Sequence, residues 1–460
     1  MATIDAVLSQ IDRNEAGAVQ RLFDLLAIPS ISTDPNHADD CARAADWLVR
    51  ELGSLGFEAS VRPTTGRPMV VAHAKAKRRD VPHVLFYGHY DVQPVDPLNL
   101  WKSDPFVAQI EDAPTGKRIV ARGASDDKGQ LMTFVEACRA FRETGDLPCD
   151  ISILFEGEEE SGSPSLPAFL DANKKELEAD LMLVCDTGMW DRTTPAITTM
   201  LRGLVAEEVV IHAANRDLHS GMYGGPAINP IRVLARIIAD LHDDHGRVTL
   251  QGFYDGVEEL PDDVLGQWRA LDFKEDEFLG EVGLSVPAGE HDRSVLEQIW
   301  SRPTCDVNGI WGGYTGEGSK TVLPATASAK LTFRLVGKQN PEKVSAAFHS
   351  FVRERLPADC RAEFKSRGGS SALQLPFGSE ALSRARRALQ AEWGKEPLMM
   401  ASGGSIPIVG TFKRDLKMDS LMIGFALDDD RIHSPNEKYE LTSFHKGARS
   451  WARVLATLAG

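Results

Sequence analysis

Short apolar runs alternate with helical stretches over residues 1–198, and this alternation restricts the possible folds more than any other feature. Apolar residues recur at helical spacing in 40–57 and 128–145. Strands that lack polar alternation are typical of sheets covered on both faces, so the pattern predicts an α/β layer structure. The runs expected to form strands are PMVVAHA (68–74), HVLFYG (83–88), ISILFE (151–156) and DLMLVCD (180–186).

The pattern changes near Gly203, where longer strands and amphipathic helices predict a small α+β sheet with helices on one face. The strands are expected at 203–213, 328–336 and 360–366, and the helices at 228–243 and 341–356. A helix at 378–394, a strand at 418–426 and a helix at 441–459 then resume the first pattern. We therefore expect a discontinuous first domain, 1–198 and 373–460, with a second domain, 199–372, inserted into it.

Composition excludes several classes of partner. The net charge of -16 argues against nucleic acid, and the only tight basic cluster, KAKRR at 75–79, is expected to be a solvated loop. The N-terminus lacks the pattern of a secretion signal, and no apolar stretch approaches the length of a membrane span. The six cysteines show no CxxC spacing, which fits reduced thiols. We expect a cytoplasmic protein that binds neither nucleic acid nor membrane.

Four segments place a carboxylate or a histidine directly after an apolar run, where the carboxyl ends of strands bind ligands in open α/β sheets. Carboxylates gathered there cannot all stay ionised without a cation. Imidazole and carboxylate ligands without thiolate suit Zn²⁺, Mn²⁺ or Co²⁺, so the sequence predicts a pair of divalent metal ions. The segments are YGHYD with His89 and Asp91, ARGASDDKG with Asp126 and Asp127, FEGEEESG with its glutamates, and VCD with Asp186.

Asp91 is predicted to orient the ring of His89, because residues two apart in an extended segment point to the same side. Each signal alone has a simpler interpretation. An HxD pair is usually structural, a run of glutamates is usually a solvated turn, and an Asp after a strand often caps the next helix. Their combination in this order favours the metal site.

Two other kinds of site fail on sequence grounds. GYTGEGSKT at 313–321 is similar to a phosphate-binding loop, but Ser319 stands where that loop requires lysine, and the segment precedes a strand. The chain has no GxSxG motif, and no cysteine has the local context of a nucleophile. Covalent catalysis therefore has no candidate.

Ten motifs in order along nearly the whole chain resemble a family of di-zinc aminoacyl hydrolases. The family includes carnosinase, cytosolic nonspecific dipeptidase, glutamate carboxypeptidase, and the acetylornithine and succinyl-diaminopimelate deacylases. The DPLNLWKSDPF, DLHSG, KTVLP and HSPNEK forms are most similar to its dipeptidase members. The motifs are GHYDVQPV, LWKSDPF, RGASDDKG, EGEEESGS, VCD, DLHSGMYGG, KTVLP, FRLV, GGSIP and IHSPNEK.

The resemblance implies a metallopeptidase catalytic domain with a mixed sheet, an inserted ferredoxin-like lid and dimerisation domain, and two divalent ions, most readily Zn²⁺. It implies that Asp126 bridges both ions and that Glu159 is the general base, with a cis peptide after Asp126. The implied metal ligands are His89, Asp126, Glu160, Asp186 and His433.

In the inserted domain, the resemblance implies that His219 reaches into the site of a partner subunit to stabilise the oxyanion. It implies that Arg334 binds the substrate carboxylate, assisted by Thr321 and the backbone around Gly404 and Ser405. The alternatives are that His219 is only a turn residue, that Arg334 pairs with an internal carboxylate, and that His433 caps a loop. The remaining histidines interpreted as structural include His73, His212, His245 and His445.

Three functions are compatible with these residues. The first is a metallodipeptidase or carboxypeptidase that recognises a free α-carboxylate, and the second is a deacylase of N-acyl amino acids with the same site. The third is a binding protein that holds metal but has lost catalysis, against which the complete ligand set and Glu159 argue. The sequence therefore favours an amide hydrolase, expected to act as a homodimer.

Overall fold

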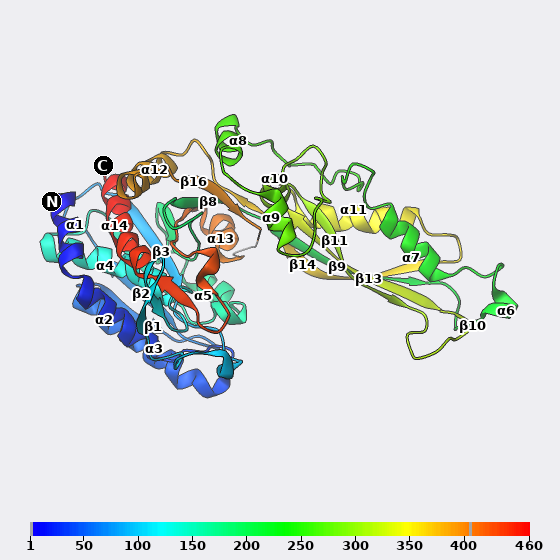
Figure 1. The fold of residues 1–460 in the computed structure, drawn as a ribbon, viewed down its shortest axis with the longest axis horizontal. Helices are drawn as coiled ribbons and strands as arrows, with labels where there is room; N and C mark the ends of the chain where they lie inside the picture. Colours follow the sequence, from blue (N-terminus) through cyan, green and yellow to red (C-terminus); the bar gives the residue numbers. More distant parts are fainter. Residues whose placement is uncertain (1–2, 404–406) are drawn as a thin grey trace. The chain divides into compact units, whose positions relative to one another are not determined.

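The computed structural model describes residues 3–403 and 407–460, which fall into two compact units (Figure 1). Unit 1 comprises Met1–Thr199, Leu375–Met400 and Thr411–Gly460, and unit 2 comprises Met200–Gln374 and Ala401–Gly410. The mixed α/β character predicted from the sequence is confirmed.

The largest sheet has nine strands and is mixed. Its central strands β6, β3, β7 and β17 run parallel to one another, whereas β1, β2, β8 and β15 pair antiparallel with their neighbours and β16 pairs with β8. β3, β6 and β7 are buried along nearly their whole length, as expected for strands covered on both faces. Side by side, the strands are β1 (Glu58–Arg62), β2 (Met69–Ala74), β6 (Asp150–Glu156), β3 (His83–His89), β7 (Leu181–Val184), β17 (Asp419–Met422), β8 (Ala196–Leu201) and β15 (Leu373–Gln374), with β16 (Leu398–Ser402) beside β8.

Aromatic rings join this sheet to its helices. Phe86 of β3 stacks on Phe134 of α4 with 3.7 Å between ring centroids, and Trp451 of α14 meets both rings edge-on at 5.5 and 5.6 Å. α4 is buried around most of its circumference because it lies inside this core. The helices of unit 1 are α1 (Ile4–Arg13), α2 (Glu15–Leu26), α3 (Ala38–Ser54), α4 (Lys128–Thr144), α5 (Leu166–Asn173), α12 (Glu380–Trp393) and α14 (Leu441–Leu458), whereas α13 (Pro407–Thr411) belongs to unit 2 except for its last residue.

Unit 2 contains a four-stranded antiparallel sheet in the order β11-β13-β9-β14. α7 and α11 share one apolar core with the alternate, inward-facing residues of β9, so both cover the same face (Figure 1). Leaving aside α8–α10 and the short elements β10, α6 and β12, the element order is β-α-β-β-α-β, the ferredoxin-like arrangement. The elements are β9 (Gly203–His212), α7 (Pro230–Ala239), α8 (Asp262–Arg269), α9 (Glu275–Gly280), α10 (Val295–Trp300), β11 (Thr304–Gly312), β13 (Thr326–Leu335), α11 (Pro341–Glu354) and β14 (Arg361–Ser370).

Two small sheets and the helices α8–α10 were not predicted from the sequence. In unit 1, β18 (Lys438–Glu440), β5 (Gly116–Val120) and β4 (Gln109–Ala113) form a three-stranded sheet. In unit 2, β10 (Leu218–His219) pairs with β12 (Val322–Leu323), and α6 (Ser220–Tyr223) follows β10 directly. Strands this short carry too few residues for a periodic signal.

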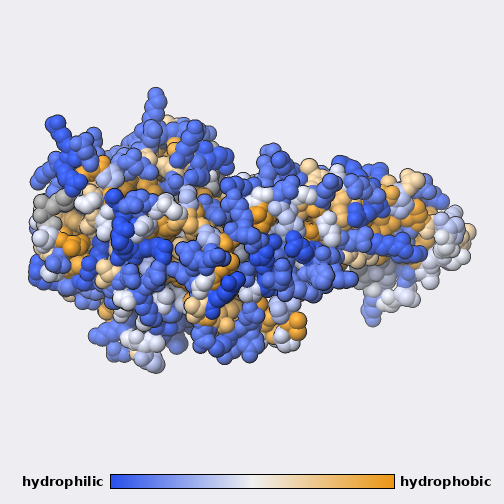
Figure 2. Space-filling view, turned by 90° about the horizontal axis from the view of Figure 1, so that it is seen from above, coloured by the Kyte–Doolittle hydropathy of each residue, from blue (hydrophilic) through white to orange (hydrophobic). Residues whose placement is uncertain are grey.

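The surface drawn in Figure 2 shows hydrophobic residues in small patches among hydrophilic ones, an ordinary distribution for a folded chain. Among the helices that the structure describes, none is both long and apolar enough to cross a membrane.

Candidate metal centre

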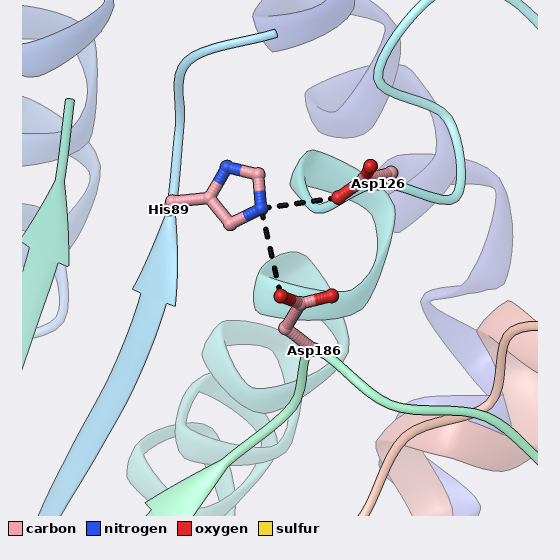
Figure 3. Close-up of side chains that lie close together, drawn as sticks. All are labelled: His89, Asp126 and Asp186. Carbon is pink, nitrogen blue, oxygen red and sulfur yellow. Dashed lines mark hydrogen bonds and ion pairs between the residues drawn. The ribbon is translucent and has the colours of Figure 1, made fainter. Parts of the chain in front are cut away.

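His89, Asp126 and Asp186 converge at the carboxyl end of the central strands (Figure 3). His89 is the last residue of β3, Asp186 follows β7, and Asp126 lies in the loop between β5 and α4. The Nε2 atom of His89 lies 3.0 Å from Asp126 Oδ1 and 3.9 Å from Asp186 Oδ2. These three side chains could hold one metal ion.

A second group of donors shares the same aspartate. His433 Nε2 lies 2.9 Å from Asp126 Oδ2 and 3.2 Å from Glu160 Oε2. Within each group the potential ligand atoms all lie within 4.8 Å of one another. Because one oxygen of Asp126 faces each histidine, its carboxylate is placed to bridge two ions. The Asp126–Asp127 peptide bond is cis, as the family resemblance implies.

The glutamate run divides into residues with different contacts. Glu159 and Glu160 begin a single 3-10 turn, Glu159–Ser161. Glu160 contacts His433, whereas no hydrogen bond or ion pair of the Glu159 side chain is recorded within the described chain. Glu158 accepts the backbone N–H of Arg67 at 2.9 Å, and Glu156 accepts the hydroxyl of Tyr87 at 2.6 Å. Glu156 and Glu158 therefore support the fold.

Asp91 has a second role that the sequence did not reveal. Its carboxylate accepts the backbone N–H groups of Glu159 at 3.2 Å and of Glu160 at 3.1 Å. The ring Nδ1 of His89 lies 3.1 Å from the Asp91 carbonyl oxygen and 3.5 Å from its carboxylate. Asp91 thus lies beside His89, and its carboxylate also holds the turn that carries the two glutamates.

Gln93 is a neighbour of the site that sequence reasoning missed. Its amide Nε2 donates to Glu160 Oε2 at 2.8 Å. This hydrogen bond limits the rotation of the Glu160 carboxylate and keeps it directed at His433. Side chains that contact a metal ligand commonly orient the ligand in this way. The segment GHYDVQPV contains Gln93, but only the fold brings it to Glu160.

The electrostatics of the cluster favour positive charge. Hydrogen bonds that the His433 ring donates to the carboxylates of Asp126 and Glu160 raise the pKa of His433 to about 10. Burial lowers the pKa of His89, but its contacts with Asp126 and Asp91 outweigh burial and raise it well above its usual value. Burial, with repulsion from Asp126, raises the pKa of Asp186 to about 7. The cluster therefore binds protons strongly, and a divalent cation would displace them.

The donor set fits a pair of borderline metal ions. Two imidazoles and three carboxylates, with no thiolate in either group, suit Zn²⁺, Mn²⁺ or Co²⁺.

Comparison with known proteins agrees with this chemistry. The model of "Peptidase family M20/M25/M40" matches residues 85–457. The chain belongs to this peptidase family.

Curated relatives of this M20 peptidase include dipeptidases. A Cys-Gly metallodipeptidase of Candida albicans is 29% identical, with 94% of this chain and 92% of the relative covered. The human Beta-Ala-His dipeptidase is 27% identical, with 100% of this chain and 93% of the relative covered. Among solved structures, the M20 family metallo-carboxypeptidase Sso-CP2 from Sulfolobus solfataricus has a TM-score of 0.78 at 31% identity, covering 96% of this chain and 99% of that one.

Unit 2 of this M20 peptidase contains His219 and Thr321 side by side. His219 ends β10 and pairs with Val322 of β12, which Thr321 directly precedes, and the backbone N–H of Ser220 donates to the Thr321 carbonyl at 3.0 Å. His219 is exposed, and its Nδ1 accepts the backbone N–H of Gly221 at 3.0 Å. With Nδ1 acting as the acceptor, Nε2 is the ring atom that can carry the proton and act as a donor.

Arg334 lies on β13 of unit 2, on the sheet face opposite the helices, and Arg202 is its neighbour. Burial and the nearby Arg334 lower the pKa of Arg202 to about 10. Within the described residues, no carboxylate forms an ion pair with either guanidinium, and Arg202 Nε donates to the Gly403 carbonyl at 3.3 Å. Gly404 and Ser405, which were also expected to assist carboxylate binding, lie outside the described residues.

Proposed function

We propose that this chain is a metal-dependent dipeptidase that hydrolyses the amide bond of dipeptides or short peptides with a free C-terminal carboxylate. The observation that carries the proposal is the shared Asp126 between two donor groups, with Glu159 adjacent to the ligand Glu160 on one turn. The named relatives that cleave Cys-Gly and Beta-Ala-His dipeptides support the substrate class.

His89 and Asp186 would hold one ion, His433 and Glu160 the other, and Asp126 both. Bound divalent ions supply Lewis acidity and acidify water, with Zn²⁺ the favoured metal. Glu159 would take the proton of the attacking water and deliver it to the leaving amine. Burial raises the pKa of Glu159, which suits a group that both accepts and returns a proton.

The substrate carboxylate would bind to unit 2. Arg334 would pair with it, Arg202 would add a second guanidinium, and Thr321 and the Gly404–Ser405 backbone would assist. Arg202 and Arg334 are neighbouring guanidiniums that form no ion pair with a carboxylate of the described residues, and two such cations favour an incoming anion, which supports this assignment. His219 would donate from Nε2 to the developing oxyanion.

We infer that unit 1 is the catalytic domain and unit 2 a lid through which the chain forms a homodimer. β11 is an edge strand, so part of its backbone is free to pair, and it exposes Val307, Ile310 and Trp311. This surface supports a protein contact. All six cysteines are free thiols, which supports a cytoplasmic location.

Hydrolysis of a substrate panel tests the function. Protein reloaded with Zn²⁺, Mn²⁺ or Co²⁺ should cleave α-dipeptides or β-alanyl dipeptides faster than N-acetyl and N-succinyl amino acids. C-terminally amidated dipeptides should be cleaved poorly, because they cannot pair with Arg334. Preference for N-acyl amino acids would identify a deacylase instead, and equal rates on amidated peptides would contradict carboxylate recognition.

Metal removal should abolish activity and lower stability together. Protein stripped with EDTA should lose hydrolysis, and the chosen ion should restore it. Free metal at 100 times its Kd should raise the free energy of unfolding by about 2.7 kcal/mol for each bound ion, because only the folded chain gathers the ligands. Denaturant unfolding with and without metal measures this change. An unchanged rate after verified metal removal would contradict the metal-dependent mechanism.

A further inference from the structure

Glu437 is a fully buried carboxylate that accepts four hydrogen bonds. Its Oε2 accepts from Arg122 Nη1 at 2.7 Å and from the backbone N–H of Gly123 at 2.9 Å. Its Oε1 accepts from the backbone N–H groups of Ser125 at 2.9 Å and Asp126 at 3.0 Å. All four donors belong to the loop between β5 and α4 that carries the shared metal ligand, and three of them are backbone N–H groups.

The segment that contains Glu437 also contains His433, and a second contact joins it to the same loop. The hydroxyl of Ser125 donates to Asp430 Oδ2 at 2.7 Å, and Lys438 Nζ donates to Asp430 Oδ1 at 2.6 Å. His433 thus lies between two anchors, Asp430 before it and Glu437 after it. Direct hydrogen bonds hold the two ligand loops against each other independently of any metal.

The position of the Asp126 backbone matters because each oxygen of its carboxylate faces a different histidine, at 3.0 Å from His89 and 2.9 Å from His433. A small displacement of the loop would change both distances together. Glu437 fixes this loop because its carboxylate accepts a hydrogen bond from the backbone N–H of Asp126.

Stability alone is a weak reason for a buried anion in this place. A buried ion pair such as Arg122 with Glu437 adds little to stability compared with well-packed apolar residues. A second carboxylate close to Asp126 also repels it. Three converging backbone N–H groups, in contrast, form a rigid and direction-specific cradle for one carboxylate.

We propose that Glu437 is a positioning residue for the two-metal site: through the backbone of Asp126, it holds the shared carboxylate at a fixed distance from His433. It thereby sets how the two ions share that carboxylate. This inference rests on the proposed function, because it requires that two ions bind.

Glu437→Gln keeps the size of the side chain and removes one acceptor oxygen. Each oxygen of Glu437 accepts from two N–H donors, so in either orientation of the glutamine amide its NH₂ group faces one of these two pairs of donors. The two donors then have no acceptor, and we expect the loop to shift. We expect the affinity for metal, measured by chelator competition, to fall about 10–100-fold. The visible absorption spectrum of the Co²⁺-loaded variant should also change, and kcat should fall while KM changes little.

Glu392→Gln is the matched control. The side chain of Glu392 is also buried and accepts from two arginines, Arg449 Nε at 2.7 Å and Arg453 Nε at 2.9 Å, but it joins α12 to α14 and contacts none of the proposed metal ligands among the described residues. This variant should lose stability while its cobalt spectrum, metal affinity and kcat stay as in the wild type. The comparison separates positioning from a general loss of stability.

Glu437→Asp covers the case in which the glutamine variant does not fold. It keeps the charge near Arg122 but is one methylene too short to reach all the donors of the loop, so it should show the same spectral and affinity changes. Folded variants with wild-type spectrum and metal affinity would overturn the proposal. So would failure of both variants to fold even with metal present, since the role would then be structural.

The spectral and affinity measurements separate this proposal from the function on which it rests. A wild-type protein that binds two Co²⁺ ions but cleaves no peptide would contradict the dipeptidase assignment and would still allow the variants to be compared. Wild-type protein that binds fewer than two ions would overturn the positioning role.

Discussion

Glu159→Gln should lower kcat by about 10²–10⁴-fold while both metal ions stay bound. Glutamine has nearly the shape of glutamate but cannot accept the proton of the attacking water. No hydrogen bond or ion pair of the Glu159 side chain is recorded within the described chain, and it belongs to neither ligand group, so the ligands should keep their places. Steady-state kinetics and metal analysis of the purified variant measure both quantities.

Glu160→Gln is the matched control, because the two residues are adjacent and carry the same charge. The Glu160 carboxylate lies 3.2 Å from His433 Nε2, so its replacement should weaken metal binding at that group and lower activity for this reason. High concentrations of added metal should restore part of the activity of Glu160→Gln and none of the activity of Glu159→Gln. A near-wild-type rate for Glu159→Gln would show that another group is the base.

The grouping of the ligands could be predicted because it depends on local sequence and one rule of topology. His89, Glu159, Glu160 and Asp186 follow strands of the central sheet, and parallel strands bring such residues to one edge. The structure brings His89 and Asp186 together at this edge, whereas Asp126 comes from the loop after β5 of the small three-stranded sheet, so the rule does not explain its position. Their roles in binding and catalysis remain predictions that the mutants must test.

His433 could not be placed by that rule, since no strand leads directly to it. It lies in the segment between β17 and β18, with a positive φ of 60°, and it comes to Asp126 through the anchors at Asp430 and Glu437. The IHSPNEK motif suggested it only through family resemblance. The physical reason for its position became visible once the fold was known.

Contacts to backbone atoms account for most of what the sequence did not reveal. The Asp91 carboxylate accepts hydrogen bonds from the backbone N–H groups of Glu159 and Glu160, and the Glu437 carboxylate accepts them from those of Ser125 and Asp126. Every residue except proline has such a group, so these pairs leave no complementary side chain in the sequence. The two-residue spacing in the sequence therefore indicated a contact between Asp91 and His89, but it could not indicate the hydrogen bonds of Asp91 to the turn that carries Glu159 and Glu160.

His219→Asn should lower kcat about 10²–10³-fold, the usual cost of losing one oxyanion donor. The hydrogen bond from Gly221 to Nδ1 leaves the proton of His219 on Nε2, directed away from its own turn. Asparagine is shorter and cannot reach as far. His245→Asn is the control, because His245 is another exposed histidine of unit 2, and this change should leave kcat unaltered.

Mixing two inactive variants tests whether His219 acts on the partner subunit. In a heterodimer of His219→Asn with Glu159→Gln, one site would combine an intact Glu159 with the partner's intact histidine. Purified heterodimers should then show about half of the wild-type rate, because one of the two equivalent sites is complete. If His219 acts within its own subunit, each site lacks one group and the heterodimer stays inactive. Differently tagged subunits allow the heterodimer to be isolated and its rate compared with both parent homodimers.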